Sequence, residues 1–181
     1  MSHRWIVTAL GQDRPGIVAG VTEVLYKLGC NLEDSAMTRL EREFTIMLIF
    51  SAPPKINEAK LTKAFAPVAK QLKLVIHTKS LTAKETAAPS KAGVPFLISV
   101  YGADRAGIVF QVAQALATAR VNITDVHTHR SASGGPSLYA MLLEVEAPAK
   151  TTDQSLTTQL ASLAKKLGVE LSVRPSEAAV L

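Results

Sequence analysis

Two short segments of the chain carry the residue types that could bind a small ligand. One starts at Gly11 and reads GQDRPGIV, and the other starts at Gly102 and reads GADRAGIV. The leading glycine suits a tight strand-to-helix turn with unusual backbone angles. Asp13 and Asp104 can accept backbone N–H bonds as helix caps. The free N–H groups at the start of such a helix would form a small anion site, for which a carboxylate is a suitable guest.

Further residues extend this interpretation. Pro15 fits the first helical turn. Gly16 and Gly107 remove a side chain where the backbone would need to approach something closely. Asn31 and Asn122 begin the next predicted strand in each copy, and their amides could reach an ammonium or hydroxyl group. The same residues would also build a well-capped turn that the fold needs twice, so repetition alone does not prove binding.

The two segments belong to an internal repeat. Shifting the sequence by 91 residues makes ten of the 24 positions from Gly11 to Asp34 identical to their partners. The offset then becomes 95, which places a four-residue insertion between Ser35 and Glu43, opposite the segment SASGGPS. We therefore expect two similar domains, at residues 1–81 and 94–175, a small polar linker at 82–93 and a short tail at 176–181.

Six elements must position the repeated segment in each half. Alternating or β-branched apolar runs predict four strands, and apolar residues at helix spacing predict two helices. The predicted strands are Trp5–Leu10, Asn31–Thr38, Phe44–Ser51 and Leu74–Thr78, then Phe96–Tyr101, Asn122–Arg130, Leu138–Glu146 and Val169–Val173. The motif Gly134–Gly135–Pro136 predicts the turn between the second and third strands of the second half.

The order of elements predicts the α+β class, with two ferredoxin-like βαββαβ domains. Each would have an antiparallel sheet with both helices on one face. Asn57 and Thr152 are the predicted caps of the second helices. Pro67 lies inside the first of these helices and predicts a kink or break there, whereas its partner Ser162 predicts none.

Composition limits the classes of function. An apolar fraction of 48% with 19% charged residues excludes global disorder. The apolar runs, such as Ile46–Phe50, fall far short of the ~20 residues that cross a bilayer. No signal peptide is recognisable, and the single cysteine Cys30 excludes a disulfide framework, so we expect a cytoplasmic protein.

The net charge of +5 gives little reason to expect nucleic-acid binding. The 20 lysines and arginines are scattered, and aromatic residues that could stack on bases make up only 5% of the chain. Lys60, Lys63, Lys70 and Lys73 have the spacing of a solvated helix face. The charge would serve solubility or an acidic partner, and we expect no direct nucleic-acid contact.

A loop of the form G-x-D-[RK]-x-G-[IL], followed by a helix and an Asn-Ile-like strand start, resembles the ACT domain. In this chain the motif stands as GQDRPGI with Asn31–Leu32 and as GADRAGI with Asn122–Ile123. The tandem arrangement looks most like the glycine cleavage system transcriptional repressor family. The resemblance implies two ACT-type domains without catalysis that bind an amino acid, glycine or serine-like, and act through a protein partner such as a transcriptional activator.

The resemblance also implies a set of ligand contacts, with a carboxylate on the backbone near Gly16 or Gly107 and an ammonium group on Asp13 or Asp104. The candidate ligand-binding residues are Gly11, Gln12, Asp13, Arg14, Pro15, Gly16, Ile17 and Asn31, then Gly102, Ala103, Asp104, Arg105, Ala106, Gly107, Ile108 and Asn122. We favour the first loop, because Gln12 and Pro15 become alanines in the second. No cofactor is expected.

Other chemistry is less well supported. His127 and His129 would lie on one face of a strand, but a zinc site needs a third ligand, so no metal site is expected. Cys30 has no recognisable activating histidine and is typical of a small packed residue. Aromatic residues are too few for an RNA-recognition module.

Two other classes stay open beside the transcriptional regulator. Acylphosphatases share a ferredoxin-like fold, and Arg14 with Asn31 could imitate their anion site, although the loop sequence does not match theirs. A regulatory subunit of an amino-acid metabolic enzyme is the main alternative. The uncovered sheet faces and edge strands could also pair with another such unit, so a homo-oligomer is possible.

Overall fold

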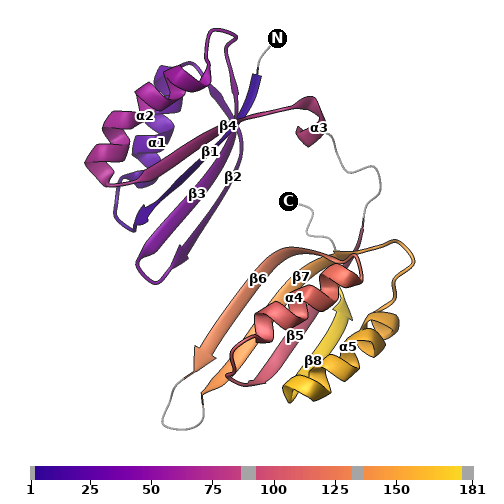
Figure 1. Cartoon of the computed structure of the whole chain (residues 1–181). Helices are drawn as coiled ribbons and strands as arrows, with labels where there is room; N and C mark the ends of the chain where they lie inside the picture. Colours follow the sequence, from indigo (N-terminus) through magenta and orange to yellow (C-terminus); the bar gives the residue numbers. More distant parts are fainter. Residues whose placement is uncertain (1–2, 87–92, 132–136, 177–181) are drawn as a thin grey trace. The chain divides into compact units, whose positions relative to one another are not determined.

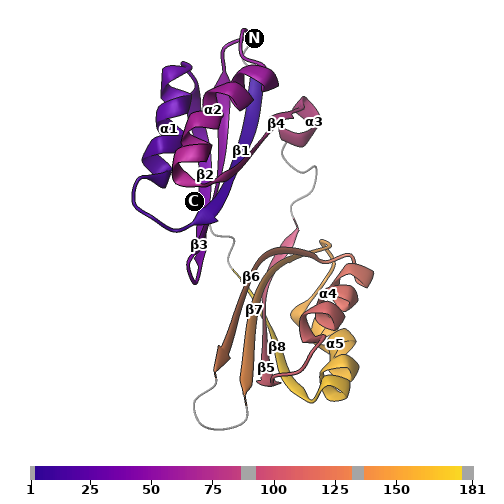
Figure 2. The same ribbon diagram turned by 60° about the vertical axis from the view of Figure 1, so that its left-hand side comes forward.

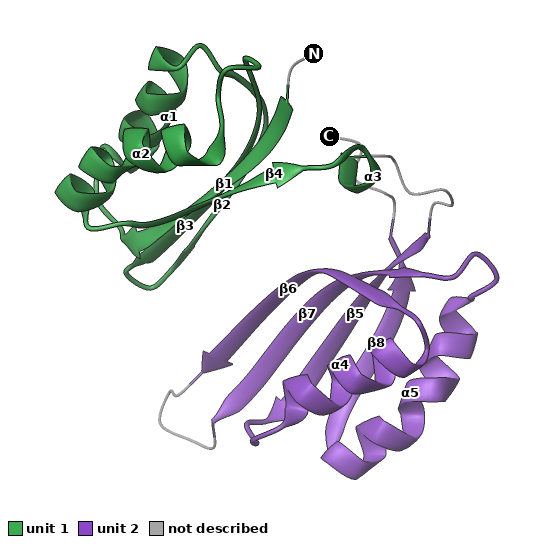
Figure 3. Ribbon diagram, turned by 45° about the horizontal axis from the view of Figure 1, so that its top comes forward, with its two compact units in different colours: residues 1–88 green, residues 89–181 purple. Residues whose placement is uncertain are grey.

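The computed structural model describes residues 3–86, 93–131 and 137–176. The chain divides into two compact units, residues 1–88 (unit 1) and residues 89–181 (unit 2), shown in Figure 3. The predicted turn at Gly134–Gly135–Pro136, part of the predicted linker and most of the predicted tail lie outside the described residues. Each unit is described separately below.

Both units have the predicted order of strand, helix, strand, strand, helix, strand. Unit 1 consists of β1 (His3–Gln12), α1 (Ile17–Lys27), β2 (Asn31–Leu40), β3 (Glu43–Ala52), α2 (Glu58–Leu72) and β4 (Val75–Leu81), and the short helix α3 (Ala83–Thr86) follows. Unit 2 consists of β5 (Val94–Ala103), α4 (Ile108–Thr118), β6 (Asn122–Ser131), β7 (Leu138–Ala147), α5 (Asp153–Leu167) and β8 (Val169–Pro175). Most strands are longer than predicted: β1 begins two residues before Trp5 and ends two residues after Leu10.

Each unit contains one four-stranded antiparallel sheet. The strand order is β2-β3-β1-β4 in unit 1 and β6-β7-β5-β8 in unit 2. Figures 1 and 2 show that both helices of a unit cover the same face of its sheet. The other face of the sheet is left without helices. This is the predicted ferredoxin-like arrangement in both halves.

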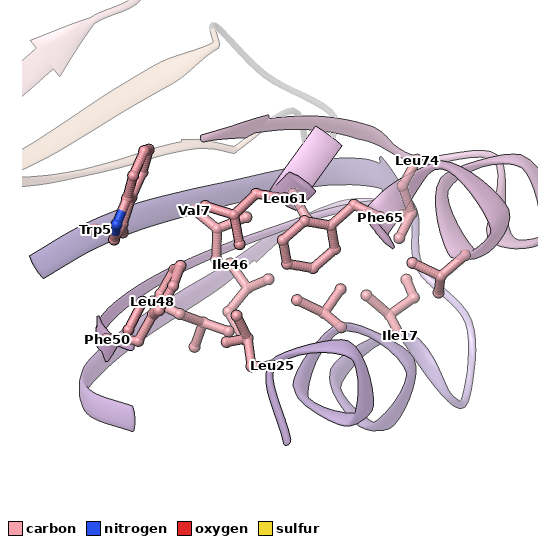
Figure 4. Close-up of a cluster of buried hydrophobic side chains, with 14 of the residues drawn as sticks. Trp5, Val7, Ile17, Leu25, Ile46, Leu48, Phe50, Leu61, Phe65 and Leu74 are labelled. Carbon is pink, nitrogen blue, oxygen red and sulfur yellow. The ribbon is translucent and has the colours of Figure 1, made fainter. Parts of the chain in front are cut away.

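The core of unit 1 lies between the sheet and its two helices (Figure 4). Alternate residues of β1 point into it, so Trp5, Val7 and Ala9 are buried, and Ile17 on α1 and Phe65 on α2 meet them from the helical side. Burying one such large side chain contributes roughly 1.5–3 kcal/mol. Apolar residues recur every two positions on the strand and every three to four positions on the helices, and this spacing fixes which face of each element meets the core.

Of the kink or break predicted at Pro67, the break does not occur. The helix α2 runs unbroken from Glu58 to Leu72, with Pro67 inside it. The side chain of Pro67 is exposed, whereas Phe65 and Val68 on the same turn are buried against the sheet. Packing of those neighbours holds the helix together across the missing N–H group. The predicted caps are confirmed, since the side chain of Asn57 accepts a hydrogen bond from Lys60 N at 3.0 Å.

The second long helix of unit 2 starts in a capping box. The Thr152 side chain accepts from Ser155 N, and the Ser155 side chain accepts from Thr152 N, both at 3.1 Å. The predicted cap at Thr152 is therefore confirmed as well. No helix among the residues that the structure describes is long and apolar enough to span a membrane.

Strand register decides what lies beside the repeated motif. In unit 1, Gly11 pairs with Phe44 and Gln12 with Glu43, so the end of β1 lies next to the β2–β3 turn. In unit 2, Gly102 pairs with Tyr139 in the same way. The loop that follows β1 or β5 therefore starts beside the tip of the neighbouring hairpin.

Candidate functional site

The repeated motif forms the connection from β1 to α1 in unit 1 and from β5 to α4 in unit 2. The helices begin after Gly16 and Gly107, whose φ and ψ angles are 96° and −6° and 90° and 0°. These angles match the third residue of a type II turn, which requires a positive φ and so favours glycine. The positive φ, rather than close contact with a neighbour, explains both glycines, because a Cβ at Gly16 would meet nothing within 4 Å.

The prediction that Pro15 lies in the first helical turn is wrong. Pro15 stands before the N-cap Gly16, in the turn that leads into α1. Its fixed φ near −65° suits the second position of a type II turn. The equivalent residue in unit 2 is Ala106, which lacks that constraint.

The predicted helix caps at Asp13 and Asp104 are also wrong. Neither α1 nor α4 has a side-chain cap, because the glycine with positive φ ends the turn three residues beyond the aspartate. Each carboxylate instead forms an ion pair with an arginine near the end of the second strand of its unit. Asp13 Oδ2 lies 3.3 Å from Arg39 Nη1, and Asp104 Oδ2 lies 3.2 Å from Arg130 Nε.

Backbone hydrogen bonds join the same loops to the residue directly before the third strand of each unit, which is β3 in unit 1 and β7 in unit 2. Asp13 N donates to the carbonyl of Arg42 at 2.7 Å, and Asp104 N donates to the carbonyl of Ser137 at 2.9 Å. Sequence analysis missed the arginines at 39 and 130. The repeat contained the signal, because the two arginines stand 91 residues apart, as the aspartates do.

The leading glycines serve packing rather than unusual backbone angles, which corrects the sequence prediction. Gly11 and Gly102 lie within regular strands, and neither has a positive φ. A Cβ on Gly11 would stand 2.8 Å from Leu74 Cδ2 and 3.0 Å from the Lys73 carbonyl oxygen. A Cβ on Gly102 would stand 2.8 Å from Val169 Cγ1. Both glycines let the chain before the last strand pass close to the first strand.

The start of α1 has backbone donors that precede the first hydrogen bond of the helix. Gly20 N is the first to bond within the helix, to Gly16 O at 2.8 Å, so the N–H groups of Ile17, Val18 and Ala19 precede the first helical bond. The first turn of α1 contains no acidic residue, and neither does that of α4. Such a helix start can hold a carboxylate by N–H donation and by the positive end of the helix dipole.

The asparagines predicted for the site lie at the other end of the sheet. Asn31 pairs with Ser51, whereas Gly11 pairs with Phe44, seven residues away along β3. At about 3.3 Å per residue this separates them by roughly 23 Å. Register in unit 2 places Asn122 seven residues from the partner of Gly102 in the same way. Neither asparagine therefore joins a site formed by the loop of its own unit.

A groove between α1 and α2 begins at the first loop. It has a volume of about 830 Å³ and is lined by Pro15 and Gly16 at one end and then by residues of both helices, including Ala19, Gly20 and Ala64. The equivalent groove between α4 and α5 has about 330 Å³. The difference follows from three larger residues in unit 2: Ala19, Gly20 and Ala64 correspond to Phe110, Gln111 and Gln159.

The histidine pair lies on the sheet face without helices. His127 and His129 line a shallow depression of about 360 Å³ with Tyr101 and Leu142, and His127 Nε2 lies 2.9 Å from Asp125 Oδ2. In the part of the chain that the structure describes, no group of three or more His, Cys, Asp or Glu residues could hold a metal ion. Burial raises the pKa of the half-buried Cys30 thiol, which packs against the core.

Comparison with known proteins places these features in a family. The sequence pattern of the ACT domain matches residues 3–79 and again residues 95–174. The glycine cleavage system transcriptional repressor of Escherichia coli K12 is 39% identical over 83 residues, which cover 45% of this chain and 43% of the repressor. The match thus spans less than half of that relative.

Two crystal structures share the tandem fold. A protein from Galdieria sulphuraria superposes with a TM-score of 0.78 at 24% identity, covering 98% of this chain and all of that one. A structure described as a candidate glycine cleavage system transcriptional repressor superposes with a TM-score of 0.69 at 19% identity, covering 96% and 97%. At these identities the likeness shows the fold. The sequence match over both units shows more: the chain belongs to the ACT domain family and contains two ACT domains in tandem.

Proposed function

We propose that this chain is a non-catalytic regulator that senses a small amino acid at the first loop and acts in the cytoplasm through a protein partner. One observation carries the proposal. The N–H groups at the start of α1 precede the first helical hydrogen bond, no acidic residue stands in that turn, and a groove of about 830 Å³ leads away from it. Membership of the ACT family and the repressor named among its relatives support the amino-acid class and a role in transcription.

The two ends of an amino acid find complementary groups on this loop. The carboxylate would accept hydrogen bonds from the N–H groups of Ile17, Val18 and Ala19. The ammonium group would bind Asp13 Oδ1, because only Oδ2 takes part in the ion pair with Arg39. Glycine and serine are the first candidates, since the relative is named for glycine cleavage.

Thermal unfolding in the presence of each common amino acid tests the proposal. Trp5 is the only tryptophan and is buried in unit 1, so its fluorescence follows that unit alone. A ligand at 100 times its Kd stabilises the folded state by about 2.7 kcal/mol. We expect glycine or serine to raise the transition reported by Trp5. If no amino acid shifts it at millimolar concentration, the proposal is wrong.

A pair of variants separates charge from size at the helix start. Ala19→Glu places a carboxylate beside the N–H groups at the start of α1, so it should abolish amino-acid binding while leaving the fold intact, because acidic residues stabilise this end of a helix. Ala19→Gln has nearly the same size without the charge and should bind more tightly than Ala19→Glu. Equal affinity of the two variants would show that the ligand carboxylate lies elsewhere.

The partner distinguishes this proposal from the regulatory-subunit alternative. Affinity purification with the wild-type chain and with Ala19→Glu, in the presence of glycine or serine, should recover a transcription factor whose amount depends on the amino acid. Recovery of an amino-acid metabolic enzyme with the same dependence would favour the alternative and contradict control of transcription.

A further inference from the structure

An ion pair joins the ligand loop to the adjacent hairpin in both units. Arg39 and Arg130 each approach Oδ2 of the aspartate in the loop, at 3.3 and 3.2 Å. The backbone bonds from the amides of Asp13 and Asp104 to the same hairpins run beside these pairs. Each loop is therefore tied to its hairpin twice, once through a side chain and once through the backbone.

The two hairpins differ in length, yet both ties are present in each. The offset between the repeats is 91 at the arginines and 95 at the two carbonyl acceptors, Arg42 and Ser137, so the four inserted residues fall between the two ties. The second acceptor keeps its place directly before the third strand, at Arg42 before Glu43 and at Ser137 before Leu138. The backbone bond therefore continues the ladder between the first and third strands in both units.

The ion pair contributes little to stability. The arginine side chains are 66% exposed in both units, and ion pairs in this setting are screened by water. In unit 1, Arg39 Nη1 donates to Asp13 Oδ2, and Asp13 Oδ1 has no partner among the described residues. In unit 2, the Arg130 Nε group that lies beside Asp104 Oδ2 also donates to Ser137 Oγ at 3.0 Å. A guanidinium in this place favours one orientation of the aspartate side chain.

We propose that Arg39 and Arg130 are positioning residues of the two ligand loops. This inference rests on the proposed function in one respect: Asp13 is the group that receives the ligand's ammonium. Arg39 touches no ligand. It fixes the carboxylate that does.

Arg39→Ala and Arg42→Ala form a matched pair of variants. Arg42 stands three residues from Arg39, and its side chain has no hydrogen bond or ion pair among the described residues, so its removal keeps both ties. Amide hydrogen exchange at residue 13 reports the backbone tie, and the amide of Asp104 serves as a reference within the same molecule. Arg39→Ala should speed exchange at residue 13, and Arg42→Ala should not.

Binding of glycine and of L-serine to the full chain gives the second measurement. Arg39→Ala should weaken binding roughly tenfold, the lower end of what losing the hydrogen-bonding partner of a ligating side chain costs at metal sites, whereas Arg42→Ala should leave it unchanged. The charge-swapped double variant, Asp13→Arg with Arg39→Asp, should restore slow amide hydrogen exchange at residue 13. It should not bind the amino acid, because the carboxylate is no longer at position 13.

The outcomes separate the two proposals. Suppose that neither amino acid binds the wild-type chain, but that Arg39→Ala speeds amide hydrogen exchange at residue 13 and the charge-swapped double variant slows it again. The proposed function then fails, and the role of Arg39 in holding the loop stands. If an amino acid binds and Arg39→Ala behaves like Arg42→Ala in both measurements, the positioning role is wrong and the proposed function stands.

Discussion

Alanine substitutions at Gly11 and Gly16 test two different reasons for glycine within one loop. At Gly11 the new Cβ would lie 2.8 Å from Leu74 Cδ2 and 3.0 Å from the backbone oxygen of Lys73. At Gly16 it would meet nothing within 4 Å, but the residue would keep a φ of 96°. The first substitution is therefore opposed by packing and the second by backbone strain.

The packing cost is the larger by a small margin. Overpacking typically costs about 1–3 kcal/mol, and alanine recovers about 0.4–1 kcal/mol by restricting the unfolded chain, so the middle of these ranges leaves a loss of about 1.3 kcal/mol at Gly11. A non-glycine residue with positive φ costs about 1–2 kcal/mol before the same recovery, which in the same way leaves about 0.8 kcal/mol at Gly16. Asparagine tolerates positive φ better than alanine, so Gly16→Asn should lose less than Gly16→Ala.

Urea unfolding followed by Trp5 fluorescence measures both losses, because Trp5 reports unit 1 alone. The matching variants Gly102→Ala and Gly107→Ala should leave the Trp5 transition where it is in the wild type. A neutral Gly11→Ala would refute the argument from packing. A Gly16→Asn variant no more stable than Gly16→Ala would refute the argument from backbone conformation.

Three further predictions concern stability and titration. Ala106→Pro should stabilise unit 2 by about 0.4–1 kcal/mol in thermal unfolding, because Pro15 holds the same place in unit 1, and a decrease would show that the two turns differ. Phe65→Ala should cost about 3–5 kcal/mol in the Trp5 transition, since Phe65 is 2% exposed, and a loss below 1 kcal/mol would contradict its place in the core. Hydrogen bonds from Lys79 and Thr82 lower the pKa of Glu85 to about 2, so the stability that they contribute is full above about pH 4.5 and is lost as the pH falls through about 2. An NMR titration of Glu85 should show this pKa, and Lys79→Ala should move the pKa back toward 4.5, whereas an unchanged pKa in that variant would rule out Lys79 as the main cause.

Local sequence patterns predicted the fold well, because the spacing of apolar residues in each element depends on which of its faces is buried. The alternation of Trp5, Val7 and Ala9 predicts a strand with one buried face, and Asn57 predicts a helix start that the structure confirms. Pro67 does not break α2, although its residue type predicts a kink or break, because whether a helix continues through proline depends on how firmly its neighbours pack, and that is a tertiary property.

The site was harder to predict from sequence. The residues Asp13 to Gly16 fit a helix capped by aspartate with proline in its first turn, and they fit equally a type II turn that ends in a glycine cap. In the structure the helix starts after Gly16, and the Asp13 carboxylate lies beside Arg39 of the hairpin, which is distant in sequence. The distance between Gly11 and Asn31 depends on strand register, which no local pattern records.

An NMR titration of the full chain with glycine and with L-serine tests the central claim most directly. The account predicts that the amide resonances of Ile17, Val18 and Ala19 shift first, with saturation at millimolar concentration or below and weaker changes at Ile108 in unit 2. Absence of shifts in both loops, or shifts confined to the depression beside His127, would contradict the claim that the first loop senses an amino acid.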